Sequence, residues 1–287
     1  MLCNICPRNC GVDRKNSKGY CKSGRNVKIS KVMFHHYEEP IISGNEHQKG
    51  SGAIFFSGCN LRCVYCQNYP ISHQNKGETI SVKRLSEIFK QLEDSKALNI
   101  NLVTPTHYTD EIIDAIKLYK PKIPIVWNSS GYEKAETIAK LKDIVDIYLV
   151  DLKYMDNKLA LRLSKAPNYV ENACESIIQM RKNQPEDIIE NGLMKKGVVV
   201  RHLVLPSYTN NSLDCLNFIA KTLGEKTIVS IMSQFEPSYV SEDYPEIKRK
   251  ITPLEYKRVI NHAIKLKLFN SYTQELSSAN IKYTPKF

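Results

Sequence analysis

The sequence predicts an α/β fold built around a parallel sheet. Six apolar segments that read as strands are each followed by a segment in which apolar residues recur at helical spacing, and this alternation is typical of parallel sheets. The predicted strands are residues 52–58, 99–108, 124–132, 145–154, 197–206 and 227–235. The pattern alone leaves open whether this sheet curls into a barrel, forms an incomplete barrel or is doubly wound.

Local signals place a helix after each predicted strand. Ser81 is expected to cap the first helix, whose apolar face carries Leu85, Ile88, Phe89 and Leu92. Thr109 is expected to cap the second, because Asp110 and Glu111 follow it in the first turn. The remaining helices are expected after Glu133, up to about Lys182, from Ser212 and over residues 253–267.

Length and composition limit the possible classes of protein. The 287 residues suffice for a large domain with a small appendage, which we place at residues 51–287 and 1–50. The chain has no apolar run near the roughly 18 residues needed to cross a bilayer, and no secretory signal, so we expect a cytoplasmic protein without a membrane partner. The net charge of +11 is spread along the chain, which makes nucleic-acid binding an unfavoured alternative.

Polar or reactive residues follow every apolar strand. In chain order they are a cysteine loop after Phe56, Thr104 to His107, Asn128 to Gly131, Asp151 to Lys153, Arg201 with His202, and Ser233 with Gln234. Ligand sites of parallel barrels lie at the carboxyl ends of the strands, so these residues predict one shared site. Taken singly, His202 would more often be a core histidine and Asp151 a helix or loop cap.

The cysteine loop reads GCNLRCVYCQN and carries Cys59, Cys63 and Cys66. In a reducing compartment clustered thiols indicate metal binding or catalysis rather than disulfides. A structural zinc would need a fourth ligand, for which His73 is the nearest candidate. A 4Fe-4S cluster normally takes one thiolate per iron, so three thiols would leave one iron open for chemistry.

The CxxxCxxC spacing, with Asn60 and Leu61 before Arg62 and with Tyr65 before the last thiol, resembles the signature of radical S-adenosylmethionine (SAM) enzymes. Over residues 50–275 the chain resembles their activating-enzyme branch, in a group related to the pyruvate formate-lyase activating enzymes. The resemblance implies a partial parallel (β/α)6 TIM-type barrel, a 4Fe-4S cluster on the three thiols, and SAM bound at the open iron. In such enzymes the reduced cluster cleaves SAM and the resulting 5′-deoxyadenosyl radical abstracts hydrogen from the substrate.

The same resemblance implies a glycyl radical enzyme as the protein substrate and a flavodoxin or ferredoxin as the electron donor. Two alternatives stay open from the sequence. One is a radical SAM enzyme acting on another peptide, an RNA or a small molecule. The other is a non-catalytic iron-sulfur or zinc protein that binds a partner.

The resemblance also assigns residues to SAM. Tyr65 and Asn68 match positions near the adenosine, Asp151 and Lys153 match the family's Asp-Leu-Lys strand end, and Arg201 matches an arginine that meets the SAM carboxylate or ribose. We add His202 from the same strand end. The usual Gly-Gly-Glu is replaced by Thr104 to His107, so Thr104 or Thr106 becomes the candidate acceptor for the SAM amino group. Asn128 stands where some relatives have an aspartate beside a monovalent cation.

A second thiol set lies near the N-terminus, in CNICPRNCGVDRKNSKGYC. Cys3, Cys6, Cys10 and Cys21 are expected to hold a structural zinc or an auxiliary iron-sulfur cluster, with unliganded thiols as the alternative. Residues 27–43 read as one or two strands that tie this module to the barrel, and residues 236–252 read as a long loop that could cover the barrel mouth.

Overall fold

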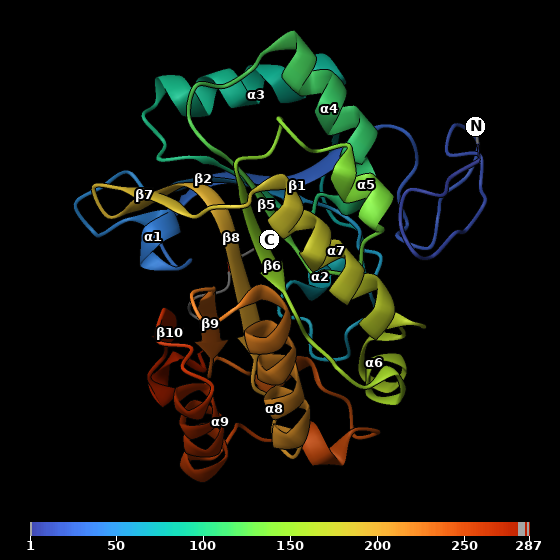
Figure 1. The fold of residues 1–287 in the computed structure, drawn as a ribbon. Coiled ribbons are helices and arrows are strands. Elements are labelled where there is room, and N and C mark those ends of the chain that lie inside the picture. Colours follow the sequence, from blue (N-terminus) through green and yellow to red (C-terminus); the bar gives the residue numbers. More distant parts are fainter. Residues whose placement is uncertain (1, 281–284, 286) are drawn as a thin grey trace.

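A computed structural model describes residues 2–280, 285 and 287 and shows an open, largely parallel sheet with helices around its outer side (Figure 1). The strand order is β10-β9-β8-β6-β5-β4-β2-β1-β3. The predicted strands are present as β2 (Ser51–Phe56), β4 (Ile100–Val103), β5 (Ile125–Ser129), β6 (Ile147–Asp151), β8 (Leu193–Leu203) and β9 (Ile228–Met232), each parallel to its neighbour. A short β10 (Ser271–Thr273) adds a further parallel strand. The predicted incomplete barrel is therefore confirmed.

Helices follow the strands as the sequence predicts, and α3, α4, α5, α7, α8 and α9 form an arc around the sheet in Figure 1. The helices are α1 (Pro40–Ser43), α2 (Tyr69–Ser72), α3 (Val82–Asp94), α4 (Thr109–Leu118), α5 (Ala135–Ala139), α6 (Asn157–Ser164), α7 (Tyr169–Asn183), α8 (Thr209–Phe218) and α9 (Pro253–Lys265). Shorter helical turns are η1 (Thr106–Tyr108), η2 (Ile219–Leu223), η3 (Pro237–Tyr239), η4 (Pro245–Ile247) and η5 (Leu276–Ser278). None of the described helices is long and apolar enough to cross a membrane.

Three of the predicted helix starts are right, at Ser81, after Glu133 and at Pro253, and two are wrong. Ser81 caps α3 as expected, since its hydroxyl accepts a hydrogen bond from the Arg84 N–H at 3.0 Å. Thr109 is instead the first residue of α4, and its hydroxyl donates to the Thr106 carbonyl at 2.7 Å because the turn η1 precedes the helix. Helix α8 begins at Thr209, before the expected Ser212.

The segment between the N-terminal module and the barrel joins the sheet. Strand β1 (Val27–His35) pairs antiparallel with β2, and β3 (Glu78–Ile80) pairs antiparallel with β1. The tie predicted for residues 27–43 is thus one strand followed by helix α1. Strand β7 (Ile188–Glu190) makes a hairpin with the start of β8. The boundary at residue 50 stays a prediction.

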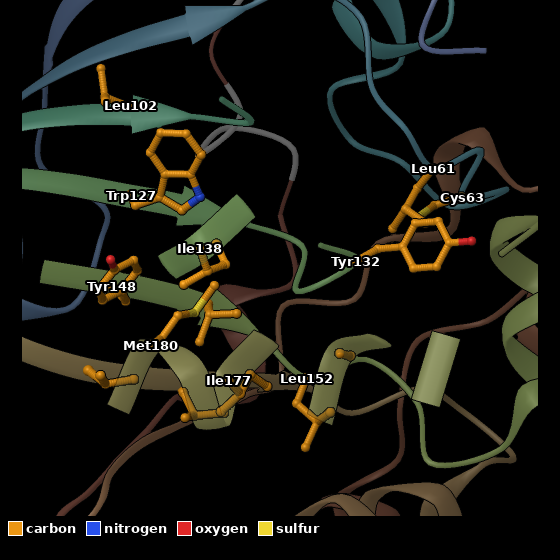
Figure 2. Close-up of a cluster of buried hydrophobic side chains, with 14 of the residues drawn as sticks. Leu61, Cys63, Leu102, Trp127, Tyr132, Ile138, Tyr148, Leu152, Ile177 and Met180 are labelled. Carbon is orange, nitrogen blue, oxygen red and sulfur yellow. The ribbon is translucent and has the colours of Figure 1, made fainter. Parts of the chain in front are cut away.

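The main core lies between the sheet and the outer helices. Leu102, Trp127 and Tyr148, from three neighbouring strands, point toward Ile138 and Met180 of the covering helices (Figure 2). These side chains are fully buried. Burial of one large apolar side chain stabilises the folded state by about 1.5 to 3 kcal/mol. This core fixes the strands and hence the positions of their carboxyl ends.

A smaller apolar cluster fills the inside of the open barrel. Ile41 and Ile42 of α1 pack against Val126, Leu149 and Val199 of β5, β6 and β8. On each of these strands the next inward residue is polar, because side chains on one face recur every second residue. The side chains of α1 therefore form an apolar layer inside the barrel, and the polar carboxyl ends of the strands lie next to this layer.

Candidate active site

The three-thiol loop connects β2 to α2 and is held by the end of helix α6. The backbone N–H groups of Arg62 and Val64 donate to the carbonyls of Ser164 and Leu163, each at 2.9 Å. Leu61 and Cys63 are buried in the main core, where Figure 2 shows them beside Tyr132. Hydrogen bonds to the end of α6 and packing against the main core therefore hold the loop and fix the positions of its cysteines.

Each thiol of this loop has a polar neighbour. The Leu61 N–H donates to Cys59 Sγ at 3.3 Å, and the Ser164 hydroxyl donates to Cys63 Sγ at 3.0 Å. The Ser72 hydroxyl lies 3.2 Å from Cys66 Sγ. Hydrogen bonds to the sulfurs are one of the ways in which proteins stabilise and tune iron-sulfur clusters. The donor set therefore fits three cluster-bound thiolates.

Burial keeps these thiols protonated when no metal is bound. Burial, followed by the nearby Cys63, raises the pKa of Cys59 to about 12 and that of Cys66 to about 11. Burial likewise raises the pKa of Cys63. Bound iron would replace these protons and neutralise the charge that burial disfavours, so metal loading releases protons here.

His73 does not complete a zinc site with the three thiols. Its Nδ1 lies 2.8 Å from the Ser72 hydroxyl, and its ring stacks on Tyr69 with centroids 4.5 Å apart. Within residues 2–280, 285 and 287, no three His, Cys, Asp or Glu side chains are placed to hold one metal ion. His73 is thus engaged with Ser72 and Tyr69 and is not placed as a fourth ligand beside the three thiols.

A cavity of about 190 Å³ opens at the carboxyl ends of the strands, next to the thiol loop. Its lining includes seven of the residues predicted from the sequence: Cys63, Tyr65, Cys66, Asn68, Asp151, Lys153 and Arg201. A larger cavity of about 560 Å³ lies between the N-terminal module and α4, and none of the three loop thiols lines it. We place the active site by its chemistry, at the smaller cavity.

Arg201 is the centre of a buried ionic network at this mouth. Its Nε donates to Asp151 at 2.8 Å, one terminal nitrogen to Glu38 at 2.8 Å and the other to Asn128 Oδ1 at 2.7 Å. Lys153 Nζ donates to the second oxygen of Asp151 at 2.6 Å. The network ties β5, β6 and β8 to the segment that follows β1, so it has a structural role whatever it binds.

The charges in this network are mutually stabilised. Burial alone would raise the pKa of Asp151, but Arg201 and Lys153 outweigh burial and hold that pKa below its usual value. Burial would lower the pKa of Lys153, yet Asp151 and Cys63 raise it above the ordinary lysine value. The mouth therefore holds two cations beside the thiols at neutral pH.

Four residues predicted to bind the cofactor do not line the cavity. His202 is fully buried on the opposite face of β8, where Nδ1 donates to the Leu152 carbonyl at 2.7 Å and Nε2 lies 2.9 Å from the Ser212 hydroxyl. It is a satisfied core histidine, because neighbouring residues of a strand point to opposite faces. Burial and Lys153 keep its pKa low, at about 4.

Thr104, Thr106 and Asn128 complete this set. The Thr106 hydroxyl is buried and donates to Glu133 at 2.8 Å, away from the mouth. Thr104 has φ of 60°, a left-handed conformation that is costly for a β-branched residue, and its N–H donates to the Asn128 carbonyl at 2.9 Å. Asn128 is bonded to Glu38 as well as to Arg201. Their roles toward SAM stay predictions.

The cavity is also lined by Gln234, one of the predicted strand-end residues, and by five residues that sequence reasoning missed: Gln67, Leu203, Met232, Phe235 and Glu236. The alternation of side chains along a strand could have identified Leu203 and Met232, because each lies an even number of residues from a side chain on the inner face of the same strand. Glu38 was missed as well, and no local pattern indicates it, because its segment enters the barrel from outside the strand-helix repeat.

Comparison with known proteins gives the class of the chain. Residues 53–219 match the Radical SAM superfamily. Over 282 residues the chain is 33% identical to an uncharacterised protein of Methanocaldococcus jannaschii, covering 93% of this chain and 75% of that one. The chain belongs to the radical SAM superfamily, and membership implies a 4Fe-4S cluster and SAM.

More distant relatives add a narrower name. A second M. jannaschii protein is 28% identical over 217 residues, covering 72% of this chain and 81% of that one, and is provisionally named a glycyl-radical enzyme activating enzyme. A Haemophilus influenzae protein with the same provisional name is 25% identical over 164 residues, covering 55% of this chain and 62% of that one.

Solved structures support the fold. Streptococcus suis SuiB bound to its precursor peptide SuiA is similar with a TM-score of 0.51 at 18% identity, over 77% of this chain and 48% of SuiB. HydG, a maturase of the [FeFe]-hydrogenase, has a TM-score of 0.50 at 15% identity, over 75% of this chain and 49% of HydG. The chain thus spans about half the length of these structures.

Proposed function

We propose that this protein reductively cleaves SAM at the barrel mouth and uses the product radical to abstract hydrogen from a glycyl radical enzyme. The observation that carries the proposal is the cavity in which Cys63 and Cys66 face Asp151, Lys153 and Arg201. A pure electron carrier has no need of two buried cations beside an open iron. The provisional names of two relatives support a protein partner.

Cys59, Cys63 and Cys66 would hold the 4Fe-4S cluster, which supplies one electron and one iron without a protein ligand. The chemistry that the cluster would supply is one-electron cleavage of the bond between the SAM sulfur and the 5′ carbon, which would give methionine and a 5′-deoxyadenosyl radical. Hydrogen abstraction from the substrate would then release 5′-deoxyadenosine. The electron comes from a one-electron donor, for which we propose a reduced flavodoxin or ferredoxin.

Lys153 is the residue of the network best able to bind the SAM carboxylate. Of its three N–H donors, one bonds to Asp151, which leaves two for a ligand. Arg201 already directs all three of its nitrogens to protein acceptors, although two of its five N–H donors remain. We therefore propose Lys153 as the main contact and Arg201 as its support.

The SAM amino group needs an acceptor in place of the family's Gly-Gly-Glu. Thr106 does not line the cavity, whereas the carboxylates of Asp151 and Glu236 do. We propose that one of these two carboxylates takes this role. Tyr65 and Asn68, which line the same cavity, stay our candidates for contact with the adenosine.

Anaerobic reconstitution with iron, sulfide and SAM tests this function. With a reductant present we expect 5′-deoxyadenosine, and with the correct glycyl radical enzyme we expect a protein radical in electron paramagnetic resonance (EPR) spectra. Formation of 5′-deoxyadenosine with no radical on any candidate partner would instead favour another peptide, an RNA or a small molecule as substrate. Absence of SAM cleavage would contradict the proposal.

A Lys153→Met variant tests the proposed contact. It removes a charge-assisted hydrogen bond to SAM of roughly 1.5 to 3 kcal/mol, so SAM affinity should fall about 10 to 150-fold while the iron content stays unchanged. Lys165→Met is a matched control, because Lys165 neither lines the cavity nor contacts Asp151. Equal SAM affinity in both variants would remove Lys153 from the site.

A further inference from the structure

Three buried hydroxyl groups connect a thiol of the barrel loop to the wall of the proposed SAM cavity. The Ser164 hydroxyl donates to Cys63 Sγ at 3.0 Å and lies 2.6 Å from the Tyr154 hydroxyl. The Tyr154 hydroxyl lies 2.6 Å from the hydroxyl of Tyr65, which lines the cavity. Ser164 and Tyr154 are fully buried and Tyr65 is 7% exposed, so these hydrogen bonds are shielded from water. We call Ser164, Tyr154 and Tyr65 the hydroxyl series.

The backbone holds Ser164 against Cys63. The carbonyls of Leu163 and Ser164, the last two residues of α6, accept hydrogen bonds from the N–H groups of Val64 and Arg62, each at 2.9 Å. These two N–H groups flank Cys63 in the sequence, so the backbone of this cysteine is held on both sides. The contact between hydroxyl and sulfur therefore follows from the way in which α6 packs on the loop.

Ring packing holds the two tyrosines of the hydroxyl series. Tyr154 packs edge-on against Tyr169 with ring centroids 5.2 Å apart, and Tyr65 packs against Phe235 with centroids 5.7 Å apart. The Tyr169 hydroxyl also accepts a hydrogen bond from the Lys153 N–H at 3.0 Å. Because protein interiors are close-packed, rings with such neighbours have little freedom to move their hydroxyl groups.

The protons of the hydroxyl series take one direction when Cys63 is a thiolate. A cluster-bound thiolate can only accept hydrogen bonds, so the Ser164 hydroxyl must donate to it. Since each hydroxyl has one proton, Ser164 must accept from Tyr154, and Tyr154 must accept from Tyr65. All three protons are then directed toward the sulfur, and Tyr65 has none left to donate to SAM.

The other two thiols of the loop have donors of a different kind. Cys59 accepts from the backbone N–H of Leu61, and the Ser72 hydroxyl beside Cys66 lies 2.8 Å from His73 Nδ1. Leu61, Ser72 and His73 do not line the cavity. The connection through side-chain hydroxyls to the cavity wall is thus a feature of Cys63.

Aligned donors stabilise negative charge on the Cys63 sulfur. Hydrogen bonds in a chain polarise one another, and a buried hydrogen bond is electrostatically stronger than one in water. A reduced cluster carries one more negative charge than the oxidised cluster, so donors to its sulfurs favour the reduced form and raise the reduction potential. The contribution should decrease from Ser164 to Tyr154 to Tyr65, because Ser164 alone of the three contacts the sulfur.

We propose that Ser164, Tyr154 and Tyr65 are positioning residues that raise the reduction potential of the cluster on the barrel loop. They act through the Cys63 thiolate, and no bond forms or breaks in this role. The role rests on the cluster placement proposed above. It adds two residues from outside the CxxxCxxC motif, Ser164 and Tyr154, to those that control SAM cleavage.

Redox titration followed by EPR tests this role on reconstituted protein without SAM. Ser164→Ala removes the hydrogen bond to the sulfur, whereas Tyr154→Phe removes the donor to Ser164 and keeps the ring. We expect the potential to shift to more negative values in both variants, most in Ser164→Ala, and to shift least in Tyr65→Phe. Iron content should match the wild type in all three variants, because every cluster ligand is retained.

Two matched controls remove a hydroxyl outside the hydroxyl series. Ser176→Ala and Tyr132→Phe each remove a hydroxyl that donates to a backbone carbonyl, and both residues are fully buried. Tyr132 also lies beside Cys63 in the core (Figure 2). Both controls should keep the wild-type potential. If Ser164→Ala loads less iron, the comparison of Tyr154→Phe with Tyr132→Phe still decides the question.

Electron nuclear double resonance distinguishes a hydrogen bond from a change in packing. Reduced wild type prepared in H2O and in D2O should differ by an exchangeable proton coupled to the cluster. This signal should be lost in Ser164→Ala and retained in Ser176→Ala. Its retention in Ser164→Ala would show that the hydroxyl does not donate to the cluster and would contradict the role.

The outcomes separate this role from the proposed function. Equal potentials in the wild type and in all three variants would overturn the role, while SAM cleavage by the wild type would show that the proposed function still holds. A wild type that loads no cluster on the three thiols would overturn both. Weakened SAM binding in Tyr65→Phe with an unchanged potential would assign this hydroxyl to the ligand and contradict the direction of the donors.

Discussion

The inner and outer faces of the sheet treat buried polar residues differently. Arg201 and His202 are adjacent on β8, yet Arg201 lines the cavity beside the thiols, whereas His202 is enclosed under α8. The inner residues form a charged network with N–H donors left over, whereas His202 and Glu133 on the outer face have hydrogen-bond partners within the core. A polar residue at a strand end therefore indicates a site only when the alternation of side chains along the strand directs it to the inner face.

Glu133, on the outer face, is a buried carboxyl group with several hydrogen-bond partners in the core. Glu133 accepts hydrogen bonds from Thr106, Trp127 and Ser129, at 2.8, 2.9 and 2.6 Å, and is fully buried. Burial raises its pKa, and no cation is among the causes that offset burial. On the inner face Asp151 has two cations as partners and a depressed pKa. The two faces thus differ in the charged side chains that they provide, and binding of an ionic ligand requires such side chains.

The largest effect should follow from removing any one thiol of the barrel loop. Cys59→Ala, Cys63→Ala or Cys66→Ala leaves the cluster with two ligands, so SAM cleavage should fall by at least about 1,000-fold, which is more than 4 kcal/mol of transition-state stabilisation. Iron counting, EPR and 5′-deoxyadenosine formation measure this. Cys174→Ala should cleave SAM like the wild type. A SAM-perturbed cluster signal in all three thiol variants would show that this loop is not the cluster site.

Removing Arg201 tests the structural side of the inner face. Arg201→Ala leaves the buried carboxylates of Asp151 and Glu38 without their shared cation, which should lower the free energy of unfolding by about 3 to 5 kcal/mol. Urea unfolding with and without SAM measures it. Arg249→Ala is the control, because its ion pair with Glu255 is half exposed on the arginine side and should contribute about 1 kcal/mol or less.

The result would also separate two roles of Arg201. Loss of stability both with and without SAM is what the three protein acceptors predict. An unchanged unfolding curve together with weakened SAM binding would assign Arg201 to the ligand alone and would contradict the network described here.

Much of the fold follows from the sequence, because each strand and helix carries a local apolar pattern. The thiol loop was also predictable, since its ligands lie within eight residues. Asp151, Lys153 and Arg201 were found by resemblance and by their position after strands. Strand parity would have removed His202 from the predicted site, because it cannot share a face with Arg201.

Other features depend on long-range packing. Glu38 reaches Arg201 across 163 residues of sequence, and Arg8 of the N-terminal module donates a hydrogen bond to the Asn60 carbonyl of the thiol loop. Neither position has a periodic or spaced signal. The hydrogen bond that the Thr106 hydroxyl donates to Glu133, away from the cavity, is likewise not indicated by any local pattern. Such contacts are determined by how elements pack together, which local sequence patterns do not encode.

The smallest effect concerns His202 and acid. Its pKa in the folded protein is about 4, below the ordinary histidine value of about 6.5, because burial disfavours the charged ring. Between these two values the unfolded chain binds a proton that the folded chain does not, so stability falls as pH decreases from 6.5 to 4. Between pH 7 and pH 5 this histidine should cost about 2 kcal/mol of unfolding free energy.

His202→Asn tests this sign. The asparagine amide can still donate to the Leu152 carbonyl but does not titrate, so unfolding free energies measured at pH 7 and pH 5 should differ by about 2 kcal/mol less than in the wild type. His47→Asn is the matched control, because it makes the same substitution at an exposed histidine outside the core. SAM affinity and iron content should match the wild type in both variants, since His202 faces the core. Weakened SAM binding in His202→Asn, with an unaltered pH dependence, would return His202 to the inner face and break the contrast between the two sides of the sheet.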